Sequence, residues 1–303
     1  MPEPNSPAVN PILSEISIQY RNNDFIADQI LPIMPVNNKT GRYLKYAKAD
    51  RFAIVDTKLA PRAEAREVEW SASDENYICK GQALKEFLGD DEKNNMPVPL
   101  QAETDTTEFV TDLMQLARER RVASLLAANV PGAAAGAKWS VAGTDVIKDV
   151  NTAIQNCFAP ANTIIMSWDV LNALDANTDI KDRIKYSQLG VLTTDLLAKL
   201  FKVDRVIVGK SRYNTAKKGQ NPSFAQVWAD NVYAAYINPR PSPKTLTLGV
   251  SFAESLFAGK GYRVRTWREE KRGLGGGQMI QVEASLDEVL MATDVAYAIQ
   301  DVL

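Results

Sequence analysis

Three consecutive residues have the types and spacing that end a phosphate-binding loop. Gly209, Lys210 and Ser211 follow an apolar run that is typical of a strand. The complete motif also requires a glycine five residues before its second glycine, but Asp204 occupies that position. The tyrosine and asparagine that come shortly afterwards would interrupt the helix whose N-terminus binds phosphate in such loops. We therefore keep a nucleotide-binding α/β enzyme only as the remote alternative.

The other residues that could do chemistry lack the partners that the chemistry needs. Glycines at 273 and 275–277 link two predicted strands, whereas dinucleotide-binding glycines lead into a helix, so they predict a hairpin turn. The sequence has no histidine, the commonest general base and a frequent metal ligand. Cys79 and Cys157 are too few for a disulfide framework or a zinc site and predict buried apolar side chains. We expect no catalytic residue, no metal and no cofactor.

Composition and charge exclude several classes of protein. The 303 residues can bury a substantial core in one large domain or two modest ones. With 35 basic and 37 acidic residues the net charge is −2, which is not the charge of a protein that grips nucleic acid tightly. No apolar run approaches the ~18 residues of a membrane helix, and the N-terminus does not have the pattern of a secretion signal.

The longest predicted element is a helix over residues 104–128, which we call the spine helix. Asp105 is its expected N-cap, with Glu108 three residues later as in a capping box. Its polar ridge becomes apolar toward the C-terminal end, so we expect the helix to pass from one layer of structure into another. An apolar stripe is expected along Phe109, Leu113, Leu116, Ala123 and Ala127.

Two segments before the spine helix need a neighbour. Residues 1–38 are rich in proline and predict an arm that docks on another element. Residues 39–75 predict a long β-hairpin whose first leg (39–51) has five basic residues and one acid, and whose second leg (64–75) has five acids and one basic residue. The opposed charges favour pairing of the legs. Neither leg has the apolar alternation that would seal one face against its own core, and an isolated hairpin is marginal in water.

The rest of the chain predicts alternating elements. Residues 78–95 suggest a short helix, and the small residues at 131–143 a domain boundary. Helical spacing then alternates with short apolar strands at 163–168 and 203–208, which predicts an α/β unit. Residues 249–303 predict β-strands.

The basic run of the spine helix could contact nucleic acid. Arg118, Arg120 and Arg121 lie around the helix instead of forming one patch, so ion pairs within the chain or between chains are favoured.

In this order of elements the chain resembles the major capsid protein of a tailed bacteriophage. Residues 26–52, residues 68–95 and the spine helix are similar to phage shell proteins. The resemblance implies an α+β fold of the Hong Kong 97-like capsid family, which encapsulin nanocompartments share. It also implies five regions: an N-terminal arm (1–38), an extended loop (39–75), a peripheral domain (76–138), an axial α/β domain (139–245), and closing strands of the peripheral domain (246–303).

The resemblance further implies a function without catalysis. The chain would self-assemble into pentamers and hexamers of an icosahedral shell that encloses double-stranded DNA, contacted non-specifically. Its partners would be a portal protein and possibly a scaffolding or decoration protein, and no membrane would be involved. The shell would assemble in the host cytoplasm and become part of the virion. An encapsulin-like shell is the alternative within the fold. The candidate contacts between subunits are Lys39, Arg42, Lys45, Lys48, Glu64, Glu67, Glu69, Arg118, Arg120 and Arg121.

Overall fold

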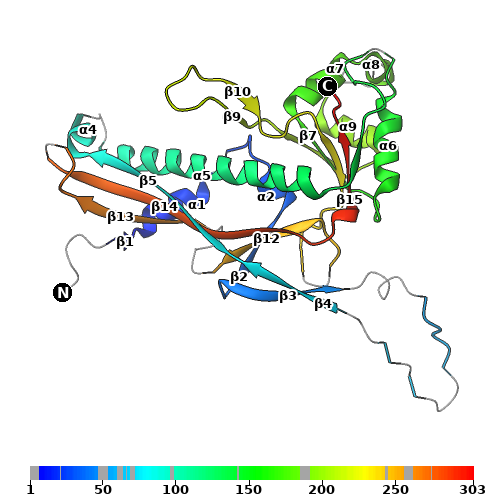
Figure 1. The fold of residues 1–303 in the computed structure, drawn as a ribbon, viewed down its shortest axis with the longest axis horizontal. Helices are drawn as coiled ribbons and strands as arrows, with labels where there is room; N and C mark the ends of the chain where they lie inside the picture. The colour runs from blue at the N-terminus through cyan, green and yellow to red at the C-terminus, as the bar shows by residue number, and fades with distance from the viewer. Residues whose placement is uncertain are drawn as a thin grey trace.

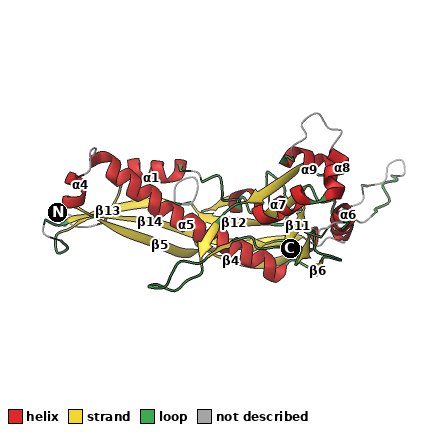
Figure 2. Ribbon diagram, turned by 90° about the horizontal axis from the view of Figure 1, so that it is seen from above, coloured by secondary structure: helices red, strands yellow, loops and turns green. Residues whose placement is uncertain are grey.

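The computed structural model describes residues 7–20, 22–46, 54–59, 64–65, 67–68, 72–95, 99–141, 143–184, 192–242, 245–255, 262–273 and 275–303. Over these residues the chain is an elongated α+β molecule with two larger sheets, joined by one long helix (Figure 1). Seen from above, the molecule is flat, and the first sheet carries helices on one face (Figure 2).

Six strands form the first sheet around the long strand β14 (Gly277–Leu290). The first half of β14 lies between β13 and β5, and its second half pairs with β12; all these pairings are antiparallel. The parallel neighbour of β12 is β2, which comes from the N-terminal region. The remaining bounds are β1 (Ala8–Val9), β2 (Ile33–Val36), β5 (Lys80–Gly89), β12 (Gly249–Glu254) and β13 (Arg263–Glu269).

The spine helix is α5 (Pro99–Asn129), and it crosses from the first sheet to the second, as expected (Figure 1). Val110 and Met114 are buried against the first sheet, whereas Val122 and Leu126 are buried in the core that borders the second. The other helices on this side are α1 (Pro11–Gln19), α2 (Ala27–Ile30) and α4 (Asp90–Asn95).

Two details of the predicted spine helix are wrong. The helix begins at Pro99, because proline is well tolerated in a first helical turn, where its missing N–H costs no hydrogen bond, so Asp105 lies inside the helix and is not its N-cap. The predicted apolar stripe faces solvent at Phe109 and Leu113, which are 55% and 39% exposed. The buried side instead includes Thr107, Thr111, Arg118 and Glu119.

Five strands form the second sheet in the order β6–β15–β11–β7–β8. The helices α6, α7 and α9 pack on this sheet and lie where the apolar spacing predicted helices. Each begins after a local cap, since the side chains of Asp145, Ser167 and Thr193 accept backbone N–H groups. The bounds are β6 (Gly132–Ala134), α6 (Val146–Asn156), β7 (Thr163–Ser167), α7 (Trp168–Ala176), α8 (Thr178–Ile184), α9 (Thr194–Phe201), β8 (Arg205–Gly209), β11 (Val232–Ala235), the 3-10 turn η1 (Thr293–Val295) and β15 (Ala296–Gln300).

Two hairpins leave the body on opposite long edges (Figure 1). The first pairs β3 (Thr40–Tyr46) with β4 (Ala72–Ile78), which confirms pairing of the predicted legs over 43–46 and 72–75. The second pairs β9 (Arg212–Asn214) with β10 (Phe224–Gln226). The base of the first hairpin does have a sealed face, contrary to expectation, because Tyr43 and Tyr77 pack on Phe252 with ring centroids 5.4 and 4.6 Å apart.

Long-range pairing overrides two further predictions. The helix expected at 78–95 is mostly the strand β5, whose ten residues pair with β14 before the short α4 begins. Residues 246–303 were expected to supply only the closing strands of the peripheral domain. They contribute β12, β13 and β14 to the first sheet, but β15 lies in the second sheet.

Candidate assembly surfaces and the spine-helix network

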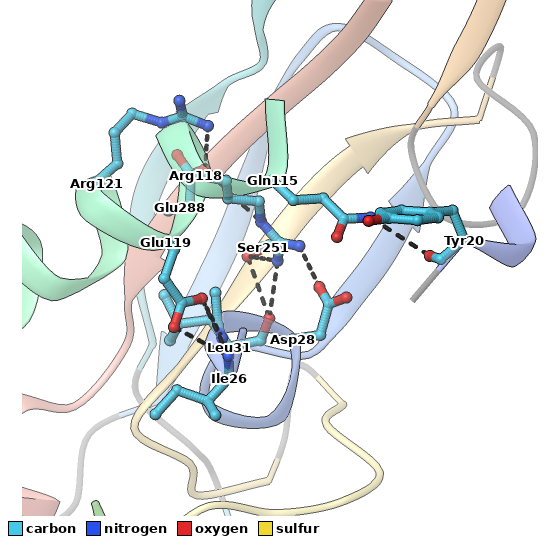
Figure 3. A network of polar contacts seen from close by, with 11 residues as sticks. Tyr20, Ile26, Asp28, Leu31, Gln115, Arg118, Glu119, Arg121, Ser251 and Glu288 are labelled. Carbon is cyan, nitrogen blue, oxygen red and sulfur yellow. Dashed lines mark hydrogen bonds and ion pairs between the residues drawn. The ribbon is translucent and has the colours of Figure 1, made fainter. Parts of the chain in front are cut away.

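Glu119, shown beside Ile26 in Figure 3, is a fully buried carboxylate that connects three parts of the fold. It lies on α5 and accepts backbone N–H groups of Ile26 at 2.9 Å and Ala27 at 2.8 Å. The indole N–H of Trp228, which precedes β11, donates to the same carboxylate at 2.6 Å. Glu119 thus caps the first turn of α2 from another helix, since these N–H groups have no partner inside a helix. Burial raises the pKa of Glu119, against the opposing effect of these donors and of Arg118.

Arg118, the preceding residue, holds the end of the N-terminal region against the first sheet (Figure 3). It forms an ion pair with Asp28 of α2 and donates to the hydroxyl of Ser251 on β12 at 3.0 Å. A second carboxylate, Glu288 of β14, lies 3.9 Å from Arg118 and 2.9 Å from Arg121. Arg118 is 3% exposed within one chain, and of the two predicted kinds of ion pair the structure shows the one within the chain.

The outward side of α5 forms an apolar groove with the β9–β10 hairpin. The groove has a volume of about 730 Å³, and Leu113, Leu116 and Leu125 line it from the helix. Tyr213 of β9 lines its other wall, and the guanidinium of Arg120 lies 4.5 Å from the centre of the Tyr213 ring. Arg120 is therefore exposed at a surface that another molecule can reach, in contrast to Arg118.

Four charged residues of the 39–75 segment that are candidate contacts between subunits have described side chains, and all four are exposed. Lys39 and Arg42 are exposed, and Arg42 pairs with Asp74 across the hairpin at 3.5 Å. Glu64 and Glu67 are exposed. Lys48, Glu69 and the side chain of Lys45 fall outside the described residues.

The residues that suggested a phosphate-binding loop have a packing role. A side-chain carbon at Gly209 would lie 2.2 Å from the indole of Trp228, so this glycine makes room for the partner of Glu119. Lys210 places its ammonium 4.6 Å from the centre of the Trp168 ring. The strand β9 follows, which gives no helix N-terminus for a phosphate. Sequence reasoning missed both Glu119 and Trp228; the only signal was an acid among apolar residues on one side of the spine helix.

The chain is similar to capsid proteins of two phages. No protein-family model matches it. The major capsid protein of Pseudomonas phage JBD67 is 28% identical over 300 residues, which cover 95% of each chain. The major capsid protein of Burkholderia phage BcepMu is 28% identical over 245 residues, 76% of each chain.

Solved structures agree with these relatives. A phage-related protein from Bordetella bronchiseptica has a TM-score of 0.76 at 22% identity and covers 98% of both chains. The chain is a homologue of phage major capsid proteins and has their fold. An encapsulin complex from Synechococcus elongatus has the same fold at a TM-score of 0.52 and 10% identity, over 89% of this chain and 85% of that one.

The described part of the chain lacks the features of two other classes of protein, metal-binding proteins and helical membrane proteins. In the described part of the chain, no cluster of histidine, cysteine, aspartate and glutamate could hold a metal ion. None of the helices described there has the length and apolar character needed to cross a membrane. A hollow of about 290 Å³ borders Arg118 and Glu119, but those side chains are engaged by the contacts given above.

Proposed function

We propose that this protein is the structural subunit of a phage shell, which self-assembles into pentamers and hexamers of an icosahedral capsid around double-stranded DNA. The observation that carries the proposal is the relationship to the major capsid protein of phage JBD67 over 95% of both chains. A match of that extent leaves no large part of the chain for a different activity. The protein acts by geometry, and we assign it no catalytic residue.

The surface of the single chain supports association. Ile54 and Leu59, between the strands of the first hairpin, are fully and 59% exposed. Phe109 on α5 and Phe224 on β10 are 55% and 66% exposed. In the proposed shell these apolar side chains would be buried between copies. The two hairpins leave opposite edges, an arrangement compatible with the head-to-tail contacts that a closed ring needs (Figure 1).

The shell would assemble in the host cytoplasm together with a portal protein and, where required, a scaffolding or decoration protein. The chain would then be part of the virion. A net charge of −2 suits a wall that encloses DNA without binding it tightly.

Electron microscopy of the full-length protein tests the proposal, first alone and then co-expressed with the proteins encoded beside it. We expect closed particles of uniform diameter whose capsomers have five-fold and six-fold symmetry. Particles made with the packaging proteins should contain nuclease-protected double-stranded DNA. Dispersed monomers under every condition would overturn the proposal.

A second candidate is an encapsulin-like compartment, which the fold shared with the Synechococcus encapsulin favours. The same particles distinguish the two functions. Mass spectrometry of purified shells would find a co-purified cargo protein, and nuclease treatment would release no protected DNA, if the chain formed such a compartment.

A further inference from the structure

The β9–β10 hairpin carries a local positive charge in a chain that is otherwise acidic. Residues 209–226 contain four basic residues and no acid, and since the whole chain has a net charge of −2, the rest of it has a net charge of −6. All four are exposed, and among the described residues none of them forms an ion pair. They are Lys210, Arg212, Lys217 and Lys218. A negatively charged partner would relieve the mutual repulsion of these cations.

The tip of this hairpin is closed by its own hydrogen bonds. The side chain of Asn214 accepts the backbone N–H groups of Ala216 at 2.9 Å and of Ser223 at 3.1 Å. These bonds span the loop that contains Lys217 and Lys218, so both charges are presented on a turn that is ordered before a partner arrives. A loop ordered in advance loses less conformational entropy on binding.

The composition of the tip favours a phosphate backbone over a protein surface. Residues 215–223 contain two lysines together with hydroxyl and amide side chains, and no large apolar residue. The buried core of a protein interface is instead enriched in aromatic residues and methionine and depleted in lysine. Lysine, serine, threonine, asparagine and glutamine are the side chains that contact phosphate oxygens in DNA complexes. Duplex DNA carries one negative charge per ~1.7 Å of its axis, so it can meet several of these cations at once.

A fifth cation joins this surface from the spine helix. Arg120 of α5 is exposed, and its guanidinium lies 4.5 Å from the centre of the Tyr213 ring on β9. The hairpin stands beside α5 and projects from the edge opposite to the first hairpin (Figure 1). The positive charge therefore extends from the tip of the hairpin to the spine helix, and two separate elements supply it.

We propose that the β9–β10 hairpin contacts the phosphate backbone of the enclosed duplex DNA. Lys217 and Lys218 make the contact at the tip, and Arg212 and Arg120 extend it toward the spine helix. The hairpin then lies on the inner surface of the shell, and the contact is independent of base sequence because it is made to phosphates. This inference rests on the proposed function, because it names the residues through which the shell meets its DNA. A few such contacts per subunit hold DNA weakly, since the rest of the chain has a net charge of −6.

Binding of DNA by the unassembled full-length protein tests the contact. The probe is a fluorescently labelled duplex of about 30 base pairs, titrated at several salt concentrations between about 50 and 200 mM. K217Q/K218Q should weaken binding about tenfold or more at the lowest salt. It should also reduce the slope of log K against log salt by about 2, since each lost phosphate contact removes about one released counterion. Two duplexes of different sequence should give the same values.

K148Q/K199Q is the matched control. It removes the same charge from exposed positions on α6 and α9 and leaves the hairpin intact, so it should bind DNA as the parent does. An equal loss in this control would show an effect of net charge alone and would overturn the inference, as would unchanged binding by K217Q/K218Q. Both variants should keep the unfolding midpoint of the parent, because the four lysines are exposed and the bonds that close the hairpin come from Asn214.

Formaldehyde treatment of DNA-filled shells tests the same contact in the particle. The reagent joins a lysine amine to a base amine within its reach, and mass spectrometry after nuclease and protease digestion identifies the modified peptide. We expect nucleotide adducts on Lys217 or Lys218. Adducts confined to other lysines, or Lys217 and Lys218 joined instead to a second protein, would overturn the inference. A parent chain that forms no shell, or shells without DNA, would refute the proposed function, whereas the loss of DNA binding in K217Q/K218Q can be measured in either case.

Discussion

The carboxylate of Glu119 accepts a 2.6 Å hydrogen bond from the indole N–H of Trp228, and this bond joins the spine helix to the turn that leads into the second sheet. The same carboxylate caps α2, so the N-terminal region, the spine helix and the second sheet share one acceptor group. Each of these donors offsets part of the cost of burying the Glu119 carboxylate, so the loss of one donor should destabilise the fold.

Trp228→Phe should therefore destabilise the chain by about 1–3 kcal/mol, since it removes a donor from a buried carboxylate. Trp267→Phe provides the control: this half-exposed tryptophan lies on β13, and its substitution should cost about 0.5 kcal/mol or less. Urea unfolding measures both free energies. Equal losses would mean that ring size, and not the hydrogen bond to Glu119, sets the cost.

Glu119 should also give the stability a defined dependence on pH. Burial raises its pKa above the ordinary value of 4.5, so the folded chain holds this proton more tightly than the unfolded chain does. The contribution of Glu119 to stability is then greatest below pH 4.5 and falls as the pH rises from that value through the raised pKa. Glu119→Gln cannot titrate. Subtracting its unfolding free energy from that of the parent at each pH isolates the effect, and a difference that rises with pH would contradict it.

Arg118 and Arg120 are neighbours on α5 with opposite expected sensitivity. Arg118→Ala removes the ion pair with Asp28 and a buried donor to the Ser251 hydroxyl, whereas Glu288 keeps Arg121 at 2.9 Å, so the loss should be about 1–3 kcal/mol. Arg120 is exposed, and its alanine variant should change the unfolding free energy by about 0.5 kcal/mol or less. Chemical denaturation of the two variants side by side provides the measurement. Similar values would show that the ion pair with Asp28 contributes little.

Elements whose structure depends on nearby residues could be predicted from the sequence. Elements that depend on residues far away in the chain could not. The helices α6 and α7 could be predicted because Asp145 and Ser167 cap them locally and apolar spacing fixes their buried side. The strand β5 could not, because its register comes from β14, about two hundred residues later. Local propensity carries no information about such a partner.

The candidate site divides in the same way. Opposed charges on residues 39–75 predicted the pairing of the first hairpin, whose strands the structure shows. The burial of Arg118 and Glu119 could not be predicted, because their partners come from residues 90 or more positions away, such as Asp28 and Trp228. Without those partners, charged residues are expected at the surface and apolar residues in the core. The same rule predicts a buried Leu113, which the structure exposes.

The two cysteines should be inert in the folded protein. Burial raises the pKa of both thiols to about 11, and Cys79 is fully buried while Cys157 is 8% exposed. A thiolate-selective disulfide reagent at pH 8 should therefore leave both unmodified and should react with both in guanidinium chloride. Lys80→Cys, at an exposed position on β5, supplies a reactive reference in the same protein. Rapid native labelling of either natural thiol would contradict its burial.

Gly209 should be intolerant of any side chain. An added methyl group would lie 2.2 Å from the indole of Trp228, and the indole cannot retreat without breaking its bond to Glu119. Gly209→Ala should thus cost about 1–3 kcal/mol or more, as overpacked cores do. Gly81→Ala on β5 meets nothing within 4 Å and should be close to neutral. Thermal unfolding compares the pair, and an equal midpoint for both variants would show that Trp228 has room to move. A double variant, Gly209→Ala with Trp228→Phe, should lose less than the sum of the two single losses, because both changes act on the same contact.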